Sequence, residues 1–490
     1  MTMKTVVSII PLLAVSVSLL AGLGIFLLRK YPNWREGCSI LAALVKFGLV
    51  MSLFPLIRDG YIIECPIVTF PAGILPNLGF ALRVDTLGFL FAVVASFLWI
   101  LTTLYSIGYM RSLEEHAQTR YYVCFALALT GALGVAFSAN LLTLFLFYEL
   151  ITVSTYLLVV HEETKEAFSA GTKYLTYLMG TGKLFFLPAI VFTYGLAGTL
   201  QFKPGGVFLG VDPVWAGLLL VLFVAGVAKT GIMPFHNWLP SAMVAPTPVS
   251  ALLHAVAVVK AGVFTIVRIV VSIYGVGFLS NIGIGIYMAI AASITVVGAS
   301  VIALRQDNLK MRLAYSTISQ LSYVILGVML LTPDGVKGSI LQIVAHAFGK
   351  ITLFFCAGAI YVGIHKKYIS EMAGIGKVMP WTMGAFTIGA LSMIGVPPLA
   401  GFSVKWRLLL GAMEAHQILI VAVLLGSTLL NAAYFLPVLK KAYFEEYAGD
   451  SHHQHEAPLI MRVALVSTAI ITVLVGLFSD SIVSLLGEIS

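Results

Sequence analysis

Ionisable side chains stand inside long apolar runs of this 490-residue sequence, where a charge is expensive. They are six lysines, Lys46, Lys183, Lys229, Lys260, Lys350 and Lys405, one carboxylate, Glu149, and two histidines, His254 and His346. A charge at the centre of a bilayer costs roughly 2.5–3.5 kcal/mol on insertion scales, so such groups must be paired, hydrated or neutral. A buried lysine that alternates between its charged and neutral forms can accept and release a proton. These residue types therefore indicate a proton path.

Glu149 is the only carboxylate deep within an apolar run, so its natural partner is a nearby lysine. Lys229 is the best match, because it comes just before Gly231 and Pro234, where a helix must break for want of a backbone donor. Pairing with Glu149 would keep Lys229 protonated, and separating the pair would push the proton onward. The alternative is a static ion pair that joins two helices. The adjoining helix break favours the functional role.

The two histidines each share a predicted helix with a lysine. His254 and Lys260 are six residues apart, on roughly opposite faces, whereas His346 and Lys350 are four apart and share a face. A proton relay is the functional interpretation of these four groups. The alternative is that the histidines are neutral and bonded to serines. Further side chains that could complete a hydrogen-bonded row with water are Gln320, Gln342 and Thr181.

A second helix break is predicted at Pro397 and Pro398, and Lys405 follows it within the same apolar run. The alternative for Lys405 is that its ammonium group snorkels to the membrane interface. Lys183 is central in its own run, and we include it in the path. Lys46 lies in an early run, and we expect it at a lipid-facing or interface position.

The composition places these charges in a membrane. Hydrophobic residues make up 60% of the chain and charged residues 10%, against about 25% charged in a soluble domain. The apolar segments are solid runs of about 20 residues, the length that spans hydrocarbon as a helix, and not the alternating strands of a barrel. The net charge of +8 does not indicate a nucleic-acid partner, because loop positions explain it better. The predicted fold class is an all-α integral membrane protein.

About fourteen transmembrane helices are expected, of which the seventh and twelfth are broken. Their approximate ranges are 5–28, 38–57, 86–109, 121–138, 141–160, 173–197, 213–243 (broken), 249–273, 282–304, 313–331, 338–364, 380–412 (broken), 418–438 and 459–486. Counted in alternate loops, fifteen Lys and Arg residues fall on one side and seven on the other. The positive-inside rule then places the richer side in the cytoplasm. We therefore expect a protein of the cell membrane with both termini on the outer side.

The chain also repeats internally. Gly182-Lys183 matches Gly349-Lys350, and three other short matches have offsets between 164 and 168 residues. A shift of five helices turns the second copy upside down in the membrane, as in transporters whose sites lie at the midplane. The expected units are 1–120 with the first three helices, 121–275 and 282–438 as inverted five-helix repeats, and 439–490 with the last loop and helix.

No cofactor motif is found. The four cysteines, Cys38, Cys65, Cys124 and Cys356, are scattered, without a CxxC pair or a Cys/His cluster at ligand spacing. The sequence has no Walker A loop and no GxGxxG after a strand. We expect that this chain binds no cofactor and no metal, and that its energy comes from an ion gradient or from a partner subunit.

Three motifs resemble the antiporter-like subunits of respiratory complex I. They are Phe147-Tyr-Glu-Leu150, the stretch from Lys229 to Pro240, and the stretch from Ala245 to His254. The same family includes subunits of Mrp-type cation/proton antiporters and of energy-converting membrane-bound hydrogenases. The resemblance covers roughly residues 80–440. It implies fourteen helices, two inverted repeats (helices 4–8 and 9–13), and breaks in helices 7 and 12.

The resemblance also implies roles for single residues. The fifth-helix glutamate of the family corresponds to Glu149 and the seventh-helix lysine to Lys229. The remaining correspondences are Lys260 and His254 in the eighth helix, His346 and Lys350 in the eleventh, and Lys405 in the twelfth, where some members carry a glutamate. Lys183 departs from the family pattern, which leaves its role open.

The function implied is proton, or cation/proton, translocation in a redox-driven complex, with no redox chemistry in this chain itself. The expected partners are the lipid bilayer, other membrane subunits of the antiporter-like kind, and a peripheral redox arm. Iron–sulfur, flavin or nickel–iron centres would be on those partner subunits. Two alternatives remain: a component of a secondary Mrp-type Na⁺/H⁺ antiporter, and a structural scaffold of the membrane part.

Overall fold

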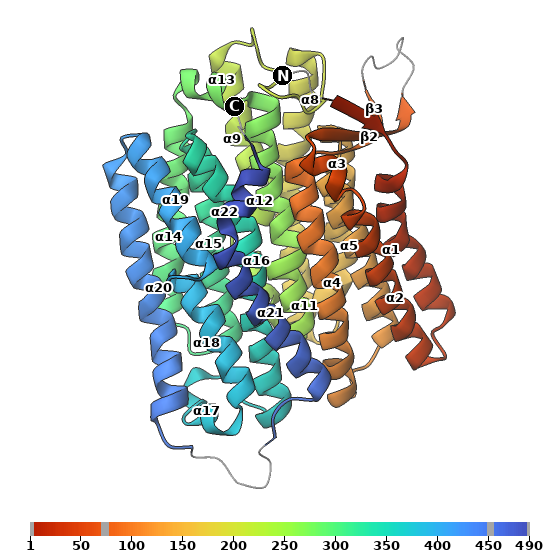
Figure 1. Ribbon diagram of the computed structural model, residues 1–490, viewed down its shortest axis with the longest axis vertical. Helices are drawn as coiled ribbons and strands as arrows, with labels where there is room; N and C mark the ends of the chain where they lie inside the picture. The colour runs from red at the N-terminus through yellow and green to blue at the C-terminus, as the bar shows by residue number, and fades with distance from the viewer. Residues whose placement is uncertain (1–3, 70–77, 448–454, 488–490) are drawn as a thin grey trace.

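The computed structural model describes residues 4–69, 78–447 and 455–487, which form a bundle of long helices (Figure 1). Eleven of its helical segments are long and apolar enough to cross a membrane. They are α1 (Ile10–Leu27), α2 and α3 (Pro32–Met51 and Phe54–Arg58), α4 (Thr86–Ser112), α5 (Gln118–Phe137), α6 (Leu141–Val159), α7 to α8 (Lys165–Ala197), α11 to η5 (Thr247–Tyr274), α14 (Gly285–Leu304), α16 (Pro333–Ile364), α20 (Ile418–Phe444) and α21 (Leu459–Leu477).

The other three expected spans are also helical, and two of them are broken as predicted. They are α9 (Pro213–Gly226), α15 (Leu309–Met329) and the pair α18 (Pro380–Ile394) and α19 (Ala400–Glu414). After α9 the chain forms only a single 3-10 turn before Trp238, and residues 395–399 separate α18 from α19. Gly231 and Gly395 have φ values of +72° and +94°, which favour glycine. The predicted all-α membrane fold with its two breaks is confirmed in the described residues.

Short elements complete the described chain. They are the π-helical turns η1 (Gly182–Phe186), η4 (Leu252–Val256) and η5 (Val270–Tyr274), the 3-10 turns η2 (Ala228–Thr230), η3 (Ala242–Val244) and η6 (Ile369–Glu371), and the helices α10 (Trp238–Ser241), α11 (Thr247–Ala251), α12 (Val258–Ile269), α13 (Val276–Ile282), α17 (Ile375–Val378) and α22 (Ser479–Leu485). The predicted last span is thus two helices, α21 and α22, because Phe478 leaves the helical path at the end of α21.

A small sheet lies beside α3 at one end of the bundle, which we call the sheet end (Figure 1). It consists of β1 (Lys4–Val7), β2 (Tyr61–Thr69) and β3 (Gly79–Val84), with β2 in the centre, parallel to β1 and antiparallel to β3. The sequence predicted a helix from residue 5 onward, and that start is wrong because α1 begins at Ile10. The opposite end of the bundle carries α17, and we call it the α17 end.

The two most buried segments contain four of the nine ionisable groups singled out above, His254, Lys260, His346 and Lys350. The most apolar part of α16 is entirely buried, and that of Thr247–Tyr274 is 94% buried, whereas that of Pro32–Arg58 is 28% buried. Helix α21 packs against both α16 and α4, so that the last long helix crosses from one part of the bundle to the other (Figure 1). Outer helices therefore enclose α12 and α16 and keep their polar side chains away from lipid.

An ion pair between the buried Arg268 and the partly exposed Asp85 fixes α12 to the start of α4. Arg268 near the end of α12 donates to both carboxylate oxygens of Asp85, with 2.8 Å between Nη2 and Oδ1. Asp85 also caps α4, since its Oδ1 accepts from the backbone N–H of Gly88 at 2.9 Å. The guanidinium group of Arg268 is almost fully buried. The Asp85 carboxylate thus accepts hydrogen bonds both from a backbone N–H that has no partner within its helix and from a buried guanidinium group.

We predict that Asp85→Ala destabilises the protein by about 3–5 kcal/mol, the usual cost of leaving one partner of a buried ion pair unpaired. Asp59→Ala is the matched control, because its pair with Arg58 is exposed and such pairs contribute about 0–1 kcal/mol. Thermal unfolding of the detergent-solubilised protein measures both variants. Equal midpoints for the two variants would show that the Asp85–Arg268 pair does not hold α12 to α4.

A candidate ion path through the bundle

The break after α9 brings Lys229 into the core against α6. Its side chain is fully buried. The ammonium group donates to the backbone carbonyl of Tyr148 and lies 3.2 Å from the centroid of the Tyr148 ring. The indole of Trp238 donates to the Ala228 carbonyl at 3.0 Å and so satisfies an acceptor that the break releases. The break therefore holds a lysine beside α6 without a carboxylate at its ammonium group.

Glu149 is close to Lys229 but does not pair with it directly. Both Glu149 carboxylate oxygens are buried and have no hydrogen-bond partner, and within the described residues no cation lies within ion-pair distance of them. Lys229 and then Lys183 are the cations that act on this carboxylate through space. The expected direct ion pair is absent because the Tyr148 carbonyl and ring take the Lys229 ammonium group. Instead the carboxylate rests on Gly182, where an added Cβ would lie 2.8 Å from Oε1.

Lys183 lies on the outside of the bundle. It belongs to the π-helical turn η1 between α7 and α8, and its side chain is exposed. The sequence placed Lys183 centrally in its apolar run. The position of Lys183 along its helix agrees with that expectation, but its side chain points away from the lysines in the core. Lys183 therefore adds a surface charge next to Glu149 and does not join the interior groups.

The centre of the bundle contains a direct lysine–histidine contact. Lys260 on α12 and His346 on α16 are both fully buried, and 2.9 Å separate Nζ from Nδ1. His254 lies in the π-helical turn η4 before α12, with its ring 4.7 Å from that of Phe354. Neither ring nitrogen of His254 has a hydrogen-bond partner among the described residues. The alternative of serine-bonded histidines is therefore wrong in this structure.

A hydrogen-bonded series continues from Lys350 along α15 and α20. The Lys350 ammonium group donates to the Ser316 hydroxyl at 2.8 Å, and Ser316 and the Tyr434 hydroxyl are 3.0 Å apart. The Tyr434 hydroxyl donates to Asn431 Oδ1 at 2.6 Å, and Asn431 Nδ2 lies 3.4 Å from the Tyr323 hydroxyl. Sequence reasoning missed this series. Buried polar residues spaced at helical intervals on α20, from Ser427 through Asn431 to Tyr434, were the signal that could have revealed it.

Lys405 lies at the second break, close to the end of this series. Its ammonium group donates to the Ile394 carbonyl at 2.7 Å and lies 5.7 Å from the centroid of the Tyr323 ring. Ile394 is the last residue of α18, so this carbonyl is one that the break leaves without a helical partner. The ammonium group of Lys405 therefore points inward and does not snorkel to the interface.

Of the three polar side chains predicted to complete the row, two bond to one another beside the second break. Gln342 Nε2 donates to Gln320 Oε1 at 2.9 Å, and Gln320 Nε2 lies 3.3 Å from the Met393 carbonyl beside the second break. Thr181 does not take part, because its hydroxyl donates to the Tyr177 carbonyl of its own helix at 2.6 Å. A threonine in a helix commonly makes this bond.

Lys46 is not at the lipid-facing or interface position that the sequence predicted. Its side chain is fully buried and does not face lipid. Its ammonium group donates to Ser18 Oγ at 2.5 Å and to the Leu129 carbonyl at 3.3 Å. The Lys46 Nζ atom also lies 5.3 Å from the centroid of the Trp99 ring. Ser18 in turn bonds to Thr130. Helices α1 and α5 thus supply the acceptors that hold this lysine between them, at a place apart from the row in the centre of the bundle.

A polar cavity of about 750 Å³ opens at the α17 end. Its ionisable lining consists of Glu115, Glu162, Glu166, Lys310, Lys366 and Lys367. Lys310 donates to the Ala245 carbonyl at 2.6 Å, in the loop before α11. Thr247, the first residue of α11, also lines the cavity. His254 is seven residues further along, or about 10 Å at the rise of a helix. The cavity therefore leads from the surface toward the buried histidines.

Comparison with known families matches most of the chain. Residues 138–431 match the family described as "NADH:quinone oxidoreductase/Mrp antiporter, TM", and residues 74–122 match "NADH-Ubiquinone oxidoreductase (complex I), chain 5 N-terminus". One similar protein is NADH-quinone oxidoreductase subunit N of Desulforudis audaxviator, 31% identical over 97% of each chain. A probable K⁺/H⁺ antiporter protein of Rhizobium meliloti is 29% identical over 92% of this chain and 44% of its own.

Solved structures give the same result. A chain of the membrane-bound sulfane sulfur reductase, an archaeal respiratory membrane complex, superposes with a TM-score of 0.86 and 26% identity, covering 98% of both chains. A chain of the Mrp complex from Dietzia has the same fold, with a TM-score of 0.83, 20% identity, and 97% and 95% of the two chains covered. The protein is thus an integral, multi-pass membrane protein that belongs to the NADH:quinone oxidoreductase/Mrp antiporter family of complex I-like and Mrp-like membrane subunits.

Proposed function

We propose that this chain moves protons, or exchanges a cation for protons, across the cell membrane as one subunit of a redox-driven complex. The observation that carries the proposal is the 2.9 Å contact between Lys260 and His346 in the fully buried centre of the bundle. Two positive charges at that distance would repel by roughly 6 kcal/mol at an effective dielectric constant of 20. The pair can therefore carry at most one positive charge, and their contact allows that proton to pass from one helix to the other.

The neighbouring contacts extend this pair in both directions. On one side, the cavity at the α17 end reaches Thr247 and leads toward His254. On the other side, Lys350 begins the hydroxyl and amide series that reaches Tyr323 and Lys405. Hydroxyl groups both donate and accept, so a series of them can relay a proton without a permanent charge. We assign the α17 end to the cytoplasm, because its loops carry the excess of lysine and arginine.

Lys229 and Glu149 would control the relay. Lys229 is bonded to a neutral carbonyl, so its charge state responds to the nearby Glu149 carboxylate without being fixed by it. Lys183 is exposed beside Glu149, on a surface that a neighbouring membrane subunit could cover. A change in that neighbour would alter the field at Glu149 and, through it, the proton on Lys229. In this way one subunit would pass its state to the next.

Similarity over the full length supports a redox-driven complex. Subunit N of an NADH-quinone oxidoreductase is 31% identical over 97% of both chains, whereas the K⁺/H⁺ antiporter protein is matched over 44% of its own length. The iron–sulfur, flavin or nickel–iron centres would lie in partner subunits, and this chain would contribute only the membrane path. Affinity purification from native membranes followed by mass spectrometry tests this. Subunits with redox cofactors would support the proposal, and membrane subunits alone would replace it with the Mrp-type alternative.

We predict that Lys229→Ala lowers proton translocation to background in proteoliposomes that contain the assembled complex, while electron transfer persists. Lys203→Ala, which removes an exposed lysine, is the control and should keep full translocation. A scaffold would behave differently: Lys229→Ala would then reduce the amount of assembled complex and leave its translocation per turnover unchanged.

A second prediction tests Glu149 without altering it. Gly182→Ala places a methyl group where the Glu149 carboxylate rests, and we expect translocation to slow by roughly tenfold, about 1.4 kcal/mol in a barrier. Gly180→Ala lies on the same helix with nothing within 4 Å of the added methyl group. It should have no effect. Alanine favours helix over glycine by about 1 kcal/mol, so neither change weakens the helix itself. Equal rates for both variants would remove Glu149 from the mechanism.

A third prediction tests the series on α20. Tyr434→Phe removes the hydroxyl that joins Ser316 to Asn431, so translocation should slow while the fold stays intact. Tyr443→Phe, on the same helix but with its hydroxyl bonded to Thr387 near the surface, serves as the control. The initial rate of vesicle acidification measures both. An unchanged rate for Tyr434→Phe would mean that protons bypass this hydroxyl.

A further inference from the structure

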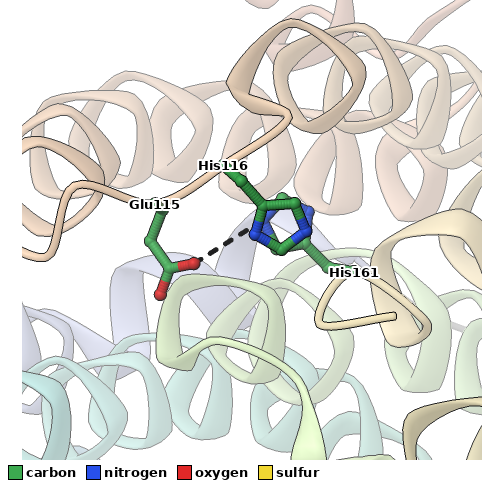
Figure 2. Close-up of side chains that lie close together, drawn as sticks. All are labelled: Glu115, His116 and His161. Carbon is green, nitrogen blue, oxygen red and sulfur yellow. Dashed lines mark ion pairs between the residues drawn. The ribbon is translucent and has the colours of Figure 1, made fainter. Parts of the chain in front are cut away.

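One carboxylate and two imidazoles converge at the α17 end, apart from the buried row. Glu115 and His116 are in the connection between α4 and α5, and His161 follows the end of α6. Figure 2 shows the Glu115 carboxylate directed at the two rings, which lie close together. One ligand atom from each residue lies within 4.8 Å of the other two. Among the described residues, this is the one group of His, Cys, Asp and Glu with such spacing.

His161 is the buried member of the group, and its polar atoms are not satisfied by the protein. The ring is fully buried, and neither nitrogen has a hydrogen-bond partner of good geometry among the described residues. Its Nε2 lies 3.8 Å from Glu115 Oε2, beyond hydrogen-bond distance. A buried polar group without a partner costs roughly 1–3 kcal/mol. The residue is nevertheless held firmly, since Arg120 donates to its backbone carbonyl at 3.1 Å and pairs with Glu163.

The donor types of this group suit a transition metal. A neutral imidazole offers a lone pair on one ring nitrogen. Neutral imidazole and carboxylate are the donors that zinc-class cations accept. Calcium and magnesium prefer sets of oxygen atoms and fit two imidazoles poorly.

We propose that Glu115, His116 and His161 form a binding site for a divalent transition-metal cation of the zinc class. Three protein ligands and one open position are typical of zinc sites that keep a bound water. Tetrahedral metal–ligand bonds of about 2.0–2.1 Å place the ligand atoms about 3.4 Å apart. The ligand atoms of the three side chains must therefore move closer together by roughly 1 Å to bind an ion. His116 is exposed and Glu115 half-buried, so their side chains can move by that amount.

The site adjoins the polar cavity, because Glu115 is a member of both. A bound cation would withdraw the Glu115 carboxylate from the cavity and place a net positive charge at its mouth. Protons would then meet a repelling charge on their way toward His254. This second step rests on the proposed function, whereas metal binding itself does not. The site would thus allow cytoplasmic metal ions to slow translocation.

Zinc binding to the purified, chelator-treated complex tests the site directly. We expect one Zn²⁺ per copy of this chain, and tetrahedral ligand-field absorption when Co²⁺ replaces it. His116→Ala changes an exposed side chain and should weaken binding by at least roughly a hundredfold, more than the loss of a residue that merely supports a ligand. His365→Ala, an exposed histidine at the same end, should bind as the parent does. Equal Zn²⁺ binding by His116→Ala and the parent would overturn the site.

A translocation assay distinguishes metal binding from its effect on the cavity. Zn²⁺ on the side of the α17 end should slow acidification by the parent complex severalfold and leave His116→Ala unaffected. Zinc binding at full occupancy without slowing would overturn control of the cavity and leave the site in place. Failure of the proposed function would look different, because the metal-free parent complex would then translocate no protons at all.

Discussion

Backbone carbonyls accept hydrogen bonds from four of the lysines within the bundle, and the architecture depends on this arrangement. Lys46, Lys229, Lys350 and Lys405 each donate to a carbonyl and have no carboxylate within ion-pair distance among the described residues. A hydrogen bond to a charged group contributes about 1.5–3 kcal/mol, much less than a buried ion pair loses when one partner is removed. A carboxylate would fix the proton on each lysine. A carbonyl stabilises the ammonium form only moderately, so the proton remains exchangeable.

The contact between Lys260 and His346 joins two differently built parts of the bundle. Toward α6 and α9, Lys229 stands among aromatic and backbone groups, with Glu149 acting only through space. Toward α20, hydroxyl and amide side chains follow one another within hydrogen-bond distance. One part is therefore suited to sensing a charge and the other to conducting a proton. The predicted inverted repeats would mean that both parts descend from one ancestral five-helix unit. That division of the chain stays a prediction.

The sequence predicted which residues matter better than how they meet. Apolar runs and prolines located the helices and both breaks, because length and missing donors act locally. Contacts depend on the rotation of each helix, which composition does not specify. Lys46 and Lys183 both look central in their runs, yet one is enclosed by α1 and α5 and the other faces outward. The strands β1 to β3 were missed because β1 has only four residues and because β2, although nine residues long, contains Pro66 and does not alternate apolar with polar side chains.

The π-helical turn η4 contains His254 and has one residue more per turn than the α-helix on either side. Such a turn can shift along its helix one residue at a time, while the helical segments at each end stay in register. A shift of one position rotates the residue that it passes by about 100°. A shift of one position past His254 would turn its ring toward other neighbours while α12 and α16 keep their places, between the polar cavity and the Lys260–His346 contact.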